Sequence, residues 1–417
     1  MSQSTPARSF GILSARARGL TRTALWAVLA AGSVAPALLL ARGGGGSRGV
    51  ASVTPGGRPG GIASADTPPA AVRPEVHRVT GLDGDRVRAA LDRVSANRAD
   101  TLPDLLHVLR LFGANASLRD AGISSDGTIL ESVLTHGRCV RLLGGPALVD
   151  TRYGIRGRPM EQQGGSRQRE RQAHEGQLLA ALAEAGVPLS RPVTTEGGTR
   201  SVGAILDDML ANFDTKQKEI EWSAIAIALY LPPRRTWCDK FNRKWSLDDL
   251  CKELIDRPLD RKRTCAATHW LYSLSIIIRV DSRIPILSSE VRSSVKAALA
   301  DAVARAGRYQ PASGAWSLRW FEGDASDDPG TAGPDGGWER ILATGHQLEW
   351  LALMPEELTP DRAATTRAIR WLHDRIDDYG AASIPGHYCP YSHAVKVLLQ
   401  ASGLRGTDLV GEAIGSH

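Results

Sequence analysis

The sequence predicts an all-α protein whose helices form an α/α toroid, with about six inner helices surrounded by outer helices. Apolar residues recur with helical periodicity along most of the chain, whereas the alternation typical of strands is scarce. Segments that are apolar nearly all round alternate with amphipathic segments, and the apolar ones begin at nearly constant intervals. With 417 residues, of which 42% are hydrophobic, the chain can bury a substantial core.

Five segments are apolar around most of their circumference, which is typical of buried helices. They are Glu175–Ala185, Ile220–Leu231, Thr268–Val280, Ile341–Met354 and Ser392–Leu399. Amphipathic segments with the polar face of surface helices lie before and between them: Leu102–Leu111, Val202–Asn212, Ser246–Ile255, Glu290–Ala306 and Pro360–Arg375. An N-cap at Ser246 and the sequence Thr359-Pro360-Asp361 mark two of the helix starts.

The buried segments begin near residues 174, 221, 269, 346 and 393, at intervals of 47, 48, 77 and 47 residues. An insertion, Ser313–Trp338, accounts for the long interval, and its alternating residues and central turn predict a hairpin or lid. The acids of this insertion are either solvated or hold Ca²⁺. One period before residue 174, residues 129–136 predict another inner helix. A fixed period indicates helix pairs that stack or close, so an open solenoid is the alternative to the toroid.

The N-terminal region predicts the location of the protein. Residues 1–41 contain an Arg-rich end and the uncharged segment Ala24–Ala41, whose 18 residues are just long enough to cross a membrane as a helix. The arginines before this segment predict a single-pass anchor in the inner or cell membrane, with the following domain on the extracytoplasmic side. A signal peptide cleaved near Ala35–Ala37 is the alternative. Residues 42–73 predict a flexible Gly/Pro/Ser linker, residues 74–405 the toroid domain and residues 406–417 a tail.

Positive charge is concentrated before residue 74, where eight arginines accompany a single acid. The whole chain has a formal charge of +6, so residues 74–417 carry −1. We therefore expect no basic nucleic-acid-binding surface on the folded part of the chain. The expected partners are the membrane, through the N-terminal segment, and a small-molecule or polysaccharide ligand; the oligomeric state stays open.

Two short motifs resemble elements of a known superfamily. Residues Gln310–Trp316 have the Q-x-x-x-G-x-W pattern, and Asp335–Trp338 the D-G-x-W turn, of the terpenoid cyclase and protein prenyltransferase toroids. The resemblance implies the toroid fold, in which the Gln and Trp join the loops between helix pairs. It does not extend to the cyclase reaction, because the chain lacks the D-x-D-D acid motif, and the Asp, Cys and His of the prenyltransferase zinc site have no residue-by-residue match.

Titratable residues recur near the starts of the predicted inner helices, where a repeat carries side chains to equivalent positions. In a closed ring these positions lie at one end and converge on a single cavity. We therefore expect a catalytic site that contains His269, His346, His393, Glu221 and Glu349, with a His or Glu as general acid or base. The alternative is that each of these residues is satisfied separately by its own loop.

A compact candidate metal site, for which zinc is the expected ion, consists of His387 and Cys389 with His346 and His393. Otherwise we expect no cofactor. A site that combines Cys265 with Cys389 is disfavoured, because helices two apart in the ring would be separated by about 17 Å. Among the five cysteines, Cys238 and Cys251 are the pair that a short disulfide loop would join.

Two classes of function follow from the sequence. The first is an extracytoplasmic toroid enzyme that acts on a carbohydrate or isoprenoid-like small molecule by acid/base chemistry. The second is a membrane-tethered binding or scaffold protein of the same fold. The motifs of serine hydrolases, P-loop proteins, zincins and dinucleotide-binding folds are absent from the sequence.

Overall fold

The fold is taken from a computed structural model of the chain. The structure describes residues 70, 72, 74–96, 101–118, 123, 126–143, 145–157, 174–231, 233, 236–257, 264–323, 336–378 and 388–404. The chain divides into two compact units, Met1–Gly57 and Arg58–His417, and every described residue belongs to the second unit.

Thirteen α-helices among the described residues make this unit mainly helical, which confirms the all-α prediction. In chain order they are α1 (Gly84–Ala96), α2 (Leu102–Phe112), α3 (Ile129–Leu134), α4 (His136–Leu143), α5 (Gln177–Glu184), α6 (Gly203–Ala211), α7 (Ile220–Tyr230), α8 (Leu247–Ile255), α9 (Thr268–Asp281), α10 (Ser289–Arg308), α11 (Gly336–Leu351), α12 (Arg362–Arg375) and α13 (Tyr388–Ser402). Every predicted helix has a counterpart. Local capping explains several starts; for example, Ser246 and Asp249 form a capping box at α8.

Three short antiparallel ribbons connect some of the helices. They are β1 (Leu148–Asp150) with β2 (Ile155–Gly157), β3 (Pro192–Thr195) with β4 (Gly198–Ser201), and β5 (Trp237–Cys238) with β6 (Lys244–Trp245). Val149 pairs with Arg156, Val193 with Arg200 and Trp237 with Trp245. Strands of two to four residues are too short to give a clear alternating pattern, which is why the sequence did not predict them.

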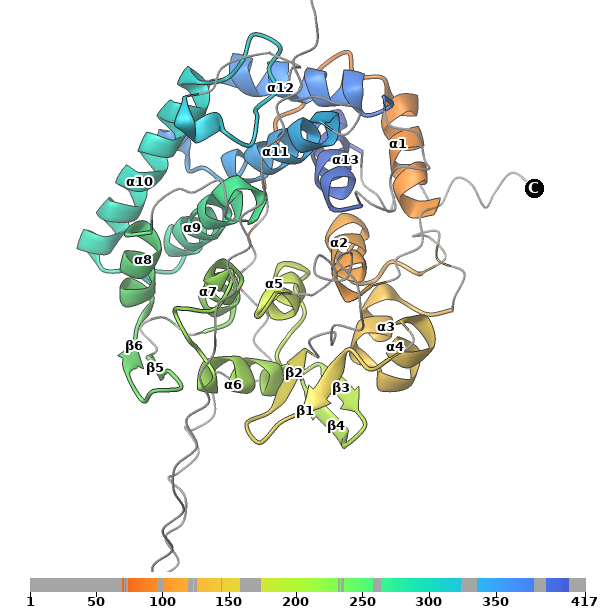
Figure 1. Ribbon diagram of the computed structural model, residues 1–417, viewed down its shortest axis with the longest axis vertical. Helices are drawn as coiled ribbons and strands as arrows, with labels where there is room; N and C mark the ends of the chain where they lie inside the picture. The colour runs from red at the N-terminus through yellow and green to blue at the C-terminus, as the bar shows by residue number, and fades with distance from the viewer. Residues whose placement is uncertain are drawn as a thin grey trace, which may run out of the picture. The chain divides into compact units, whose positions relative to one another are not determined.

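Six helices contact one another in sequence order: α2 contacts α5, α5 contacts α7, α7 contacts α9, α9 contacts α11 and α11 contacts α13. The last helix, α13, also contacts the first, α2. Figure 1 shows α8, α10 and α12 on the outer side of this series, and α8 packs on α7, α10 on α9 and α12 on α11. We call α2, α5, α7, α9, α11 and α13 the inner helices.

One predicted assignment of an inner helix is wrong. Residues 129–136 were expected to provide it, but they form the short α3 and the start of α4, and α3 packs on α2 and α4. The position beside α13 belongs to α2, which the sequence predicts as a surface helix because of its polar face. That face carries His107 and Arg110, and both side chains are buried. The polar face of α2 therefore points to a polar interior and not to solvent.

The motif Gln310–Trp316 ties three helices together. The Gln310 amide donates to the carbonyls of Gly314 (3.0 Å) and of Ala364 on α12 (2.9 Å). Trp316 donates through its indole Nε1 to a carbonyl of α10 (2.9 Å) and through its backbone N–H to a hydroxyl of α11 (3.0 Å). Gly314 has φ +96°, and a Cβ there would lie 2.7 Å from the Arg367 carbonyl carbon, so this position requires glycine.

The predicted hairpin or lid at Ser313–Trp338 is not found in the described part of that segment. Residues 313–323 contain the 3-10 turn η3 (Trp320–Glu322) and no strand, and α11 already begins at Gly336. Trp316 and Trp320 are fully buried, which anchors this stretch to the core. Residues 324–335, with the acids considered for Ca²⁺, lie outside the described residues.

The prediction of a membrane-spanning, exported protein is corrected here. In the described part of the chain, no helix combines the length and hydropathy needed to cross a membrane. The longest, α10, has 20 residues but includes six charged side chains, and the apolar helices α7 and α9 have only 11 and 14 residues. The segment Ala24–Ala41, on which the prediction rested, lies outside the described residues.

The disulfide considered between Cys238 and Cys251 is not formed. Cys238 is exposed on β5, Cys251 is buried on α8, and both are free thiols, as are Cys139, Cys265 and Cys389.

Candidate metal centre

Three of the predicted site histidines converge in the interior between the inner helices. His269 lies on α9, His346 on α11 and His393 on α13. The rings of His269 and His346 have centroids 5.1 Å apart, and those of His346 and His393 are 3.8 Å apart. Each residue is at most 8% exposed, so the three imidazoles share one enclosed environment and are not dispersed among separate loops.

Glu349, the fourth predicted residue that joins this group, lies one turn after His346 on α11. Its Oε2 is 2.6 Å from Nδ1 of His393 and 3.5 Å from Nδ1 of His346. Burial opposes ionisation of this carboxyl, but the neighbouring His393 ring, the positive charges of Lys396 and Arg110 and the hydrogen bond of His346 outweigh it. The pKa of Glu349 is therefore held well below its ordinary value, and the group is a carboxylate.

Glu221 is buried in the first turn of α7, but Glu219 is the carboxylate that reaches the histidines. Its Oε2 lies 3.4 Å from Nδ1 of His269 and 3.2 Å from Nε2 of His174, and it accepts a hydrogen bond from the indole of Trp222 (2.7 Å). Glu219 has a left-handed backbone conformation, with φ 57°. Helical periodicity predicts no such turn, so the sequence could not show which of the two carboxylates faces inward.

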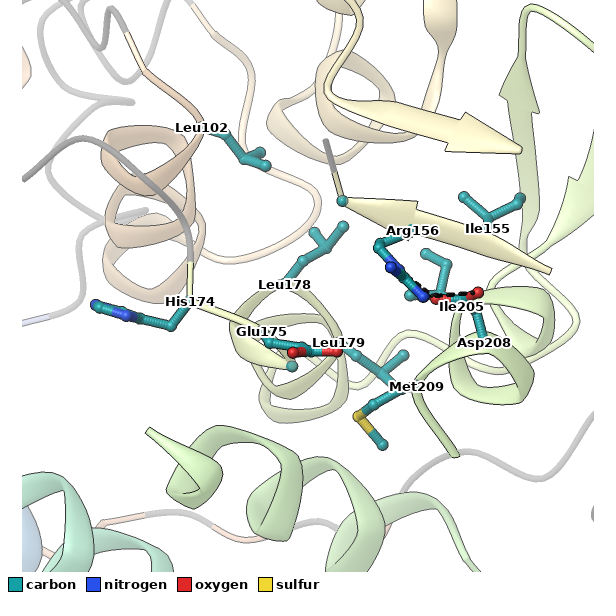
Figure 2. Close-up of a pocket in the computed structure, with 12 residues that line it drawn as sticks. Leu102, Ile155, Arg156, His174, Glu175, Leu178, Leu179, Ile205, Asp208 and Met209 are labelled. Atoms are coloured by element: carbon teal, nitrogen blue, oxygen red, sulfur yellow. Dashed lines mark hydrogen bonds and ion pairs between the residues drawn. The ribbon is translucent and has the colours of Figure 1, made fainter. Parts of the chain in front are cut away.

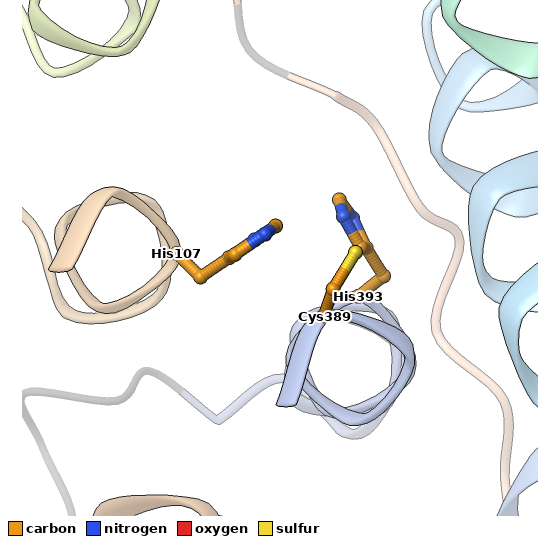
Figure 3. A group of neighbouring side chains, drawn as sticks. All are labelled: His107, Cys389 and His393. Atoms are coloured by element: carbon orange, nitrogen blue, oxygen red, sulfur yellow. The ribbon is translucent and has the colours of Figure 1, made fainter. Parts of the chain in front are cut away.

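Two thiols and a further histidine complete the arrangement, which we call the interior cluster: His107, Cys265, His346, Cys389 and His393. Figure 3 shows His107 of α2 and Cys389 and His393 of α13 directed toward one another. Ligand atoms of these three lie within 4.8 Å of one another, as do those of Cys265, His346 and Cys389, and those of His346, Glu349 and His393. Cys389 thus belongs to two of three overlapping groups that could hold a metal ion.

The expectation that Cys265 and Cys389 lie far apart is wrong. Cys265 is not on α9 itself but on the preceding 3-10 turn η2 (Thr264–Ala267), and η2 packs against α11. Left-handed backbone conformations at Cys265 and Ala267, with φ 53° and 62°, shape this turn. The turn therefore places the Cys265 thiol beside Cys389, across the gap that two regular helices would leave.

Three of the four residues of the predicted metal site lie together in the structure. Cys389, His346 and His393 belong to the interior cluster, whereas His387 lies outside the described residues. His107 and Cys265 were missed. His107 lies on a helix outside the 47-residue series of apolar segments, and the position of Cys265 depends on the η2 turn, so neither appears in the repeat.

The two thiols have different protonation behaviour. A hydrogen bond between them, together with burial, raises the pKa of Cys265 well above its ordinary value. The same hydrogen bond, with the electrostatic influence of the neighbouring His107 and His393 rings, holds the pKa of Cys389 well below its ordinary value. Because the thiolate is the form that binds metal ions, Cys389 is the stronger ligand of the two. Burial lowers the pKa of His393 to about 4, which leaves its imidazole neutral and able to ligate.

Next to the interior cluster, around Glu349, lies a set of largely buried charged and polar groups, which we call the charged layer: Arg110, Glu184, Tyr272, Glu349 and Lys396. Arg110 Nε is 3.1 Å from a Glu184 carboxylate oxygen, and the Tyr272 hydroxyl donates to the same carboxylate. Lys396 Nζ is 3.1 Å from Oε1 of Glu349. Two cations and two carboxylates balance within this layer, which reduces the cost of burying them.

A cavity of about 250 Å³ lies beside the start of α5 (Figure 2). Its walls are largely apolar, with the Arg156–Asp208 ion pair (2.7 Å) and Glu175 among the polar groups. Burial raises the pKa of Glu175. His174 lines this cavity and also contacts Glu219, so a continuous series of side chains leads from the cavity to His269.

Comparison with known proteins adds no relationship: no family model, curated protein or solved structure matches the chain.

Proposed function

We propose that this protein is an α/α toroid that holds a transition-metal ion, zinc by the nature of its ligands, in the ring interior. The ligands are Cys265, His346 and Cys389. The observation that carries the proposal is that two buried sulfur atoms and an imidazole, from η2, α11 and α13, lie within 4.8 Å of one another.

The ring is supported by the cyclic contacts of the inner helices, in which α13 packs on α2. An open solenoid would keep its first and last repeats apart, because each repeat contacts only its neighbours. The bonds of Gln310 and Trp316 to three helices also agree with the joining role that the resemblance implies for these residues.

The ligand set favours zinc over a hard cation. Thiolate and imidazole are ligands of Zn²⁺ and other borderline or soft ions, whereas Ca²⁺ and Mg²⁺ bind through oxygen. Backbone strain supports a site at Cys265, since a left-handed conformation at a non-glycine residue costs about 1–3 kcal/mol and concentrates at functional sites. Nε2 of His346 is buried and makes no hydrogen bond within the described residues, which leaves it available for coordination.

Three protein ligands leave a fourth position, which is typical of catalytic rather than structural zinc sites. We therefore favour a metal-dependent enzyme over a non-catalytic binding or scaffold protein. The enclosed cluster favours a small-molecule substrate over a polysaccharide chain, because its histidines are at most 8% exposed. His393 and His107 lie next to Cys389 and are the candidates for acid/base work beside the metal.

Metal content and cobalt substitution test the proposal. The purified chain should contain about one zinc per molecule, and the Co²⁺ form should show thiolate-to-metal charge-transfer absorption. Cys265→Ser and Cys389→Ser should each weaken or abolish both signals, while Cys251→Ser, a buried free thiol on α8, serves as the matched control and should keep them. A metal-free wild-type chain that does not take up Co²⁺, or equal losses in the control, would overturn the proposal.

A further inference from the structure

Glu349 lies between two histidines of the interior cluster and contacts both. A single oxygen, Oε2, faces Nδ1 of His393 at 2.6 Å and Nδ1 of His346 at 3.5 Å. All three side chains are at most 4% exposed, so water does not compete for these contacts. Since the two Nδ1 atoms face the carboxylate, each ring turns its Nε2 away from Glu349.

The other carboxylate oxygen is occupied by cations of the charged layer. Oε1 of Glu349 lies 3.1 Å from Lys396 Nζ and 3.8 Å from an Arg110 guanidinium nitrogen. Arg110 is in turn fixed by Glu184 and by the faces of the Trp222 and Tyr272 rings, 5.7 and 5.3 Å from its guanidinium carbon. Glu349 is therefore held from both sides, by cations at Oε1 and by imidazoles at Oε2.

We infer that Glu349 is a positioning residue for the metal centre: its carboxylate accepts the Nδ1–H of His346 and His393, which presents Nε2 of His346 to the metal and Nε2 of His393 to the fourth position. This inference rests on the proposed function. A histidine that ligates a metal ordinarily donates its other ring N–H to a carboxylate or carbonyl, which fixes its tautomer and raises its basicity. Here one carboxylate serves two rings, so one substitution should disturb both.

The first test measures zinc affinity by competition with a chelator. Glu349→Gln should lower the affinity about 10- to 100-fold, as loss of such a partner does elsewhere, while the cobalt–thiolate absorption persists because both cysteines remain. Glu349→Asp should recover part of the loss, since it restores a carboxylate. Asp281→Asn is the matched control: it removes a buried carboxylate at the end of α9 that pairs with Arg292, outside the charged layer, and it should stay within about threefold of wild type.

The second test uses the wild-type protein, so its result does not depend on whether a variant folds. In the wild-type protein labelled with ¹⁵N-histidine, nitrogen chemical shifts and couplings identify which ring nitrogen carries the proton. We expect His346 and His393 to be Nδ1–H tautomers, with and without zinc.

Two results would overturn the inference and leave the proposed function standing. One is a Glu349→Gln affinity equal to that of wild type, or a loss no larger than that of Asp281→Asn. The other is an Nε2–H tautomer at either histidine. If instead wild type binds no metal, the proposed function fails, and the tautomers in the metal-free protein still decide whether Glu349 orients the two rings.

Discussion

Asp239 illustrates how a single buried charge is accommodated in this fold. Its side chain is fully shielded from solvent and accepts hydrogen bonds from the backbone N–H groups of Phe241 and Arg243, the Arg243 guanidinium and the Trp245 indole, at 2.7–3.0 Å. Burial opposes ionisation, but these bonds outweigh it and lower the pKa of Asp239 from 3.8 to about 2. The carboxylate thereby closes the β5–β6 turn.

This shift predicts a pH dependence. Because the folded pKa lies below the unfolded one, Asp239 stabilises the fold fully above pH 3.8, and the contribution is lost as the pH falls through about 2. Asp239→Asn should lower the free energy of unfolding by about 1–3 kcal/mol at pH 7, and the difference from wild type should shrink between pH 4 and 2. Urea titrations measure it. Asp301→Asn is the control. It removes the carboxylate of the exposed Asp301–Arg305 ion pair on α10 and should change the free energy of unfolding by less than about 0.5 kcal/mol at any pH.

Site residues were predictable only where the repeat carries them. His269, His346 and His393 were expected together because they recur near the starts of apolar segments, and Glu349 follows His346 by one turn. Glu219, Cys265 and Ala267 have left-handed backbone conformations that no periodicity reveals. The sequence therefore indicated the histidines but not the carboxylate beside His269 or the second thiol.

At the scale of helices and turns, glycines set how closely the inner helices approach. Gly176, which precedes α5, has φ +80°, and a Cβ there would lie 2.7–3.0 Å from the Oγ, N and Cα atoms of Ser223 on α7. Gly186, just after α5, has nearly the same φ, +77°, but a Cβ there would meet nothing within 4 Å. The two positions share the conformational demand and differ only in the close approach.

Alanine at each glycine separates the two effects. Gly186→Ala should cost about 1–2 kcal/mol, from the left-handed conformation alone. Gly176→Ala should cost about 1–3 kcal/mol more, because the added methyl group forces α5 and α7 apart. The free energies of unfolding in urea give the comparison, and equal costs would mean that the α5–α7 approach is not tight.

Helices were predicted from the sequence far better than turns. Apolar segments such as Ile220–Leu231 fit the observed α7 almost to the residue, because a continuous apolar segment of that length fits a buried helix and is too long for a typical strand. The three ribbons were missed because each strand has at most four residues. The predicted lid failed for a related reason: Trp316 and Trp320 are spaced as on one face of a strand, yet both are buried in the core, Trp316 before the turn η3 and Trp320 at its start.

At the scale of the whole second unit, the contact between α13 and α2 supports the proposed ring, and a truncation tests it against an open array. In an open array, removing the last helix lowers the free energy of unfolding by roughly the contribution of one repeat. In a ring it exposes both α11 and α2, so a chain that ends at residue 387 should lose its cooperative unfolding transition. A chain that ends at Leu404 keeps α13 and is the comparison. Circular dichroism in urea measures both; a shortened chain that still unfolds in one sharp transition would favour the solenoid.

The contact between α2 and α13 is also what the sequence could not predict. The 47-residue period predicts repeating helix pairs but leaves open which segment meets the last one. His107 is on α2, outside the five apolar segments, and it reaches His393 (ring centroids 4.9 Å apart) because α2 packs on α13. The interior cluster therefore combines residues from α2 with residues from η2, α11 and α13, and this grouping depends on tertiary packing.

X-ray absorption at the zinc edge of the metal-loaded protein tests the central claim most directly, because it counts the atoms bound to the metal. The proposed site predicts two sulfur atoms at about 2.3 Å and nitrogen or oxygen atoms at about 2.0–2.1 Å. In Cys389→Ser, one sulfur should be lost from any zinc that remains bound. A coordination shell of nitrogen and oxygen alone would contradict the claim that Cys265 and Cys389 hold a metal inside the ring.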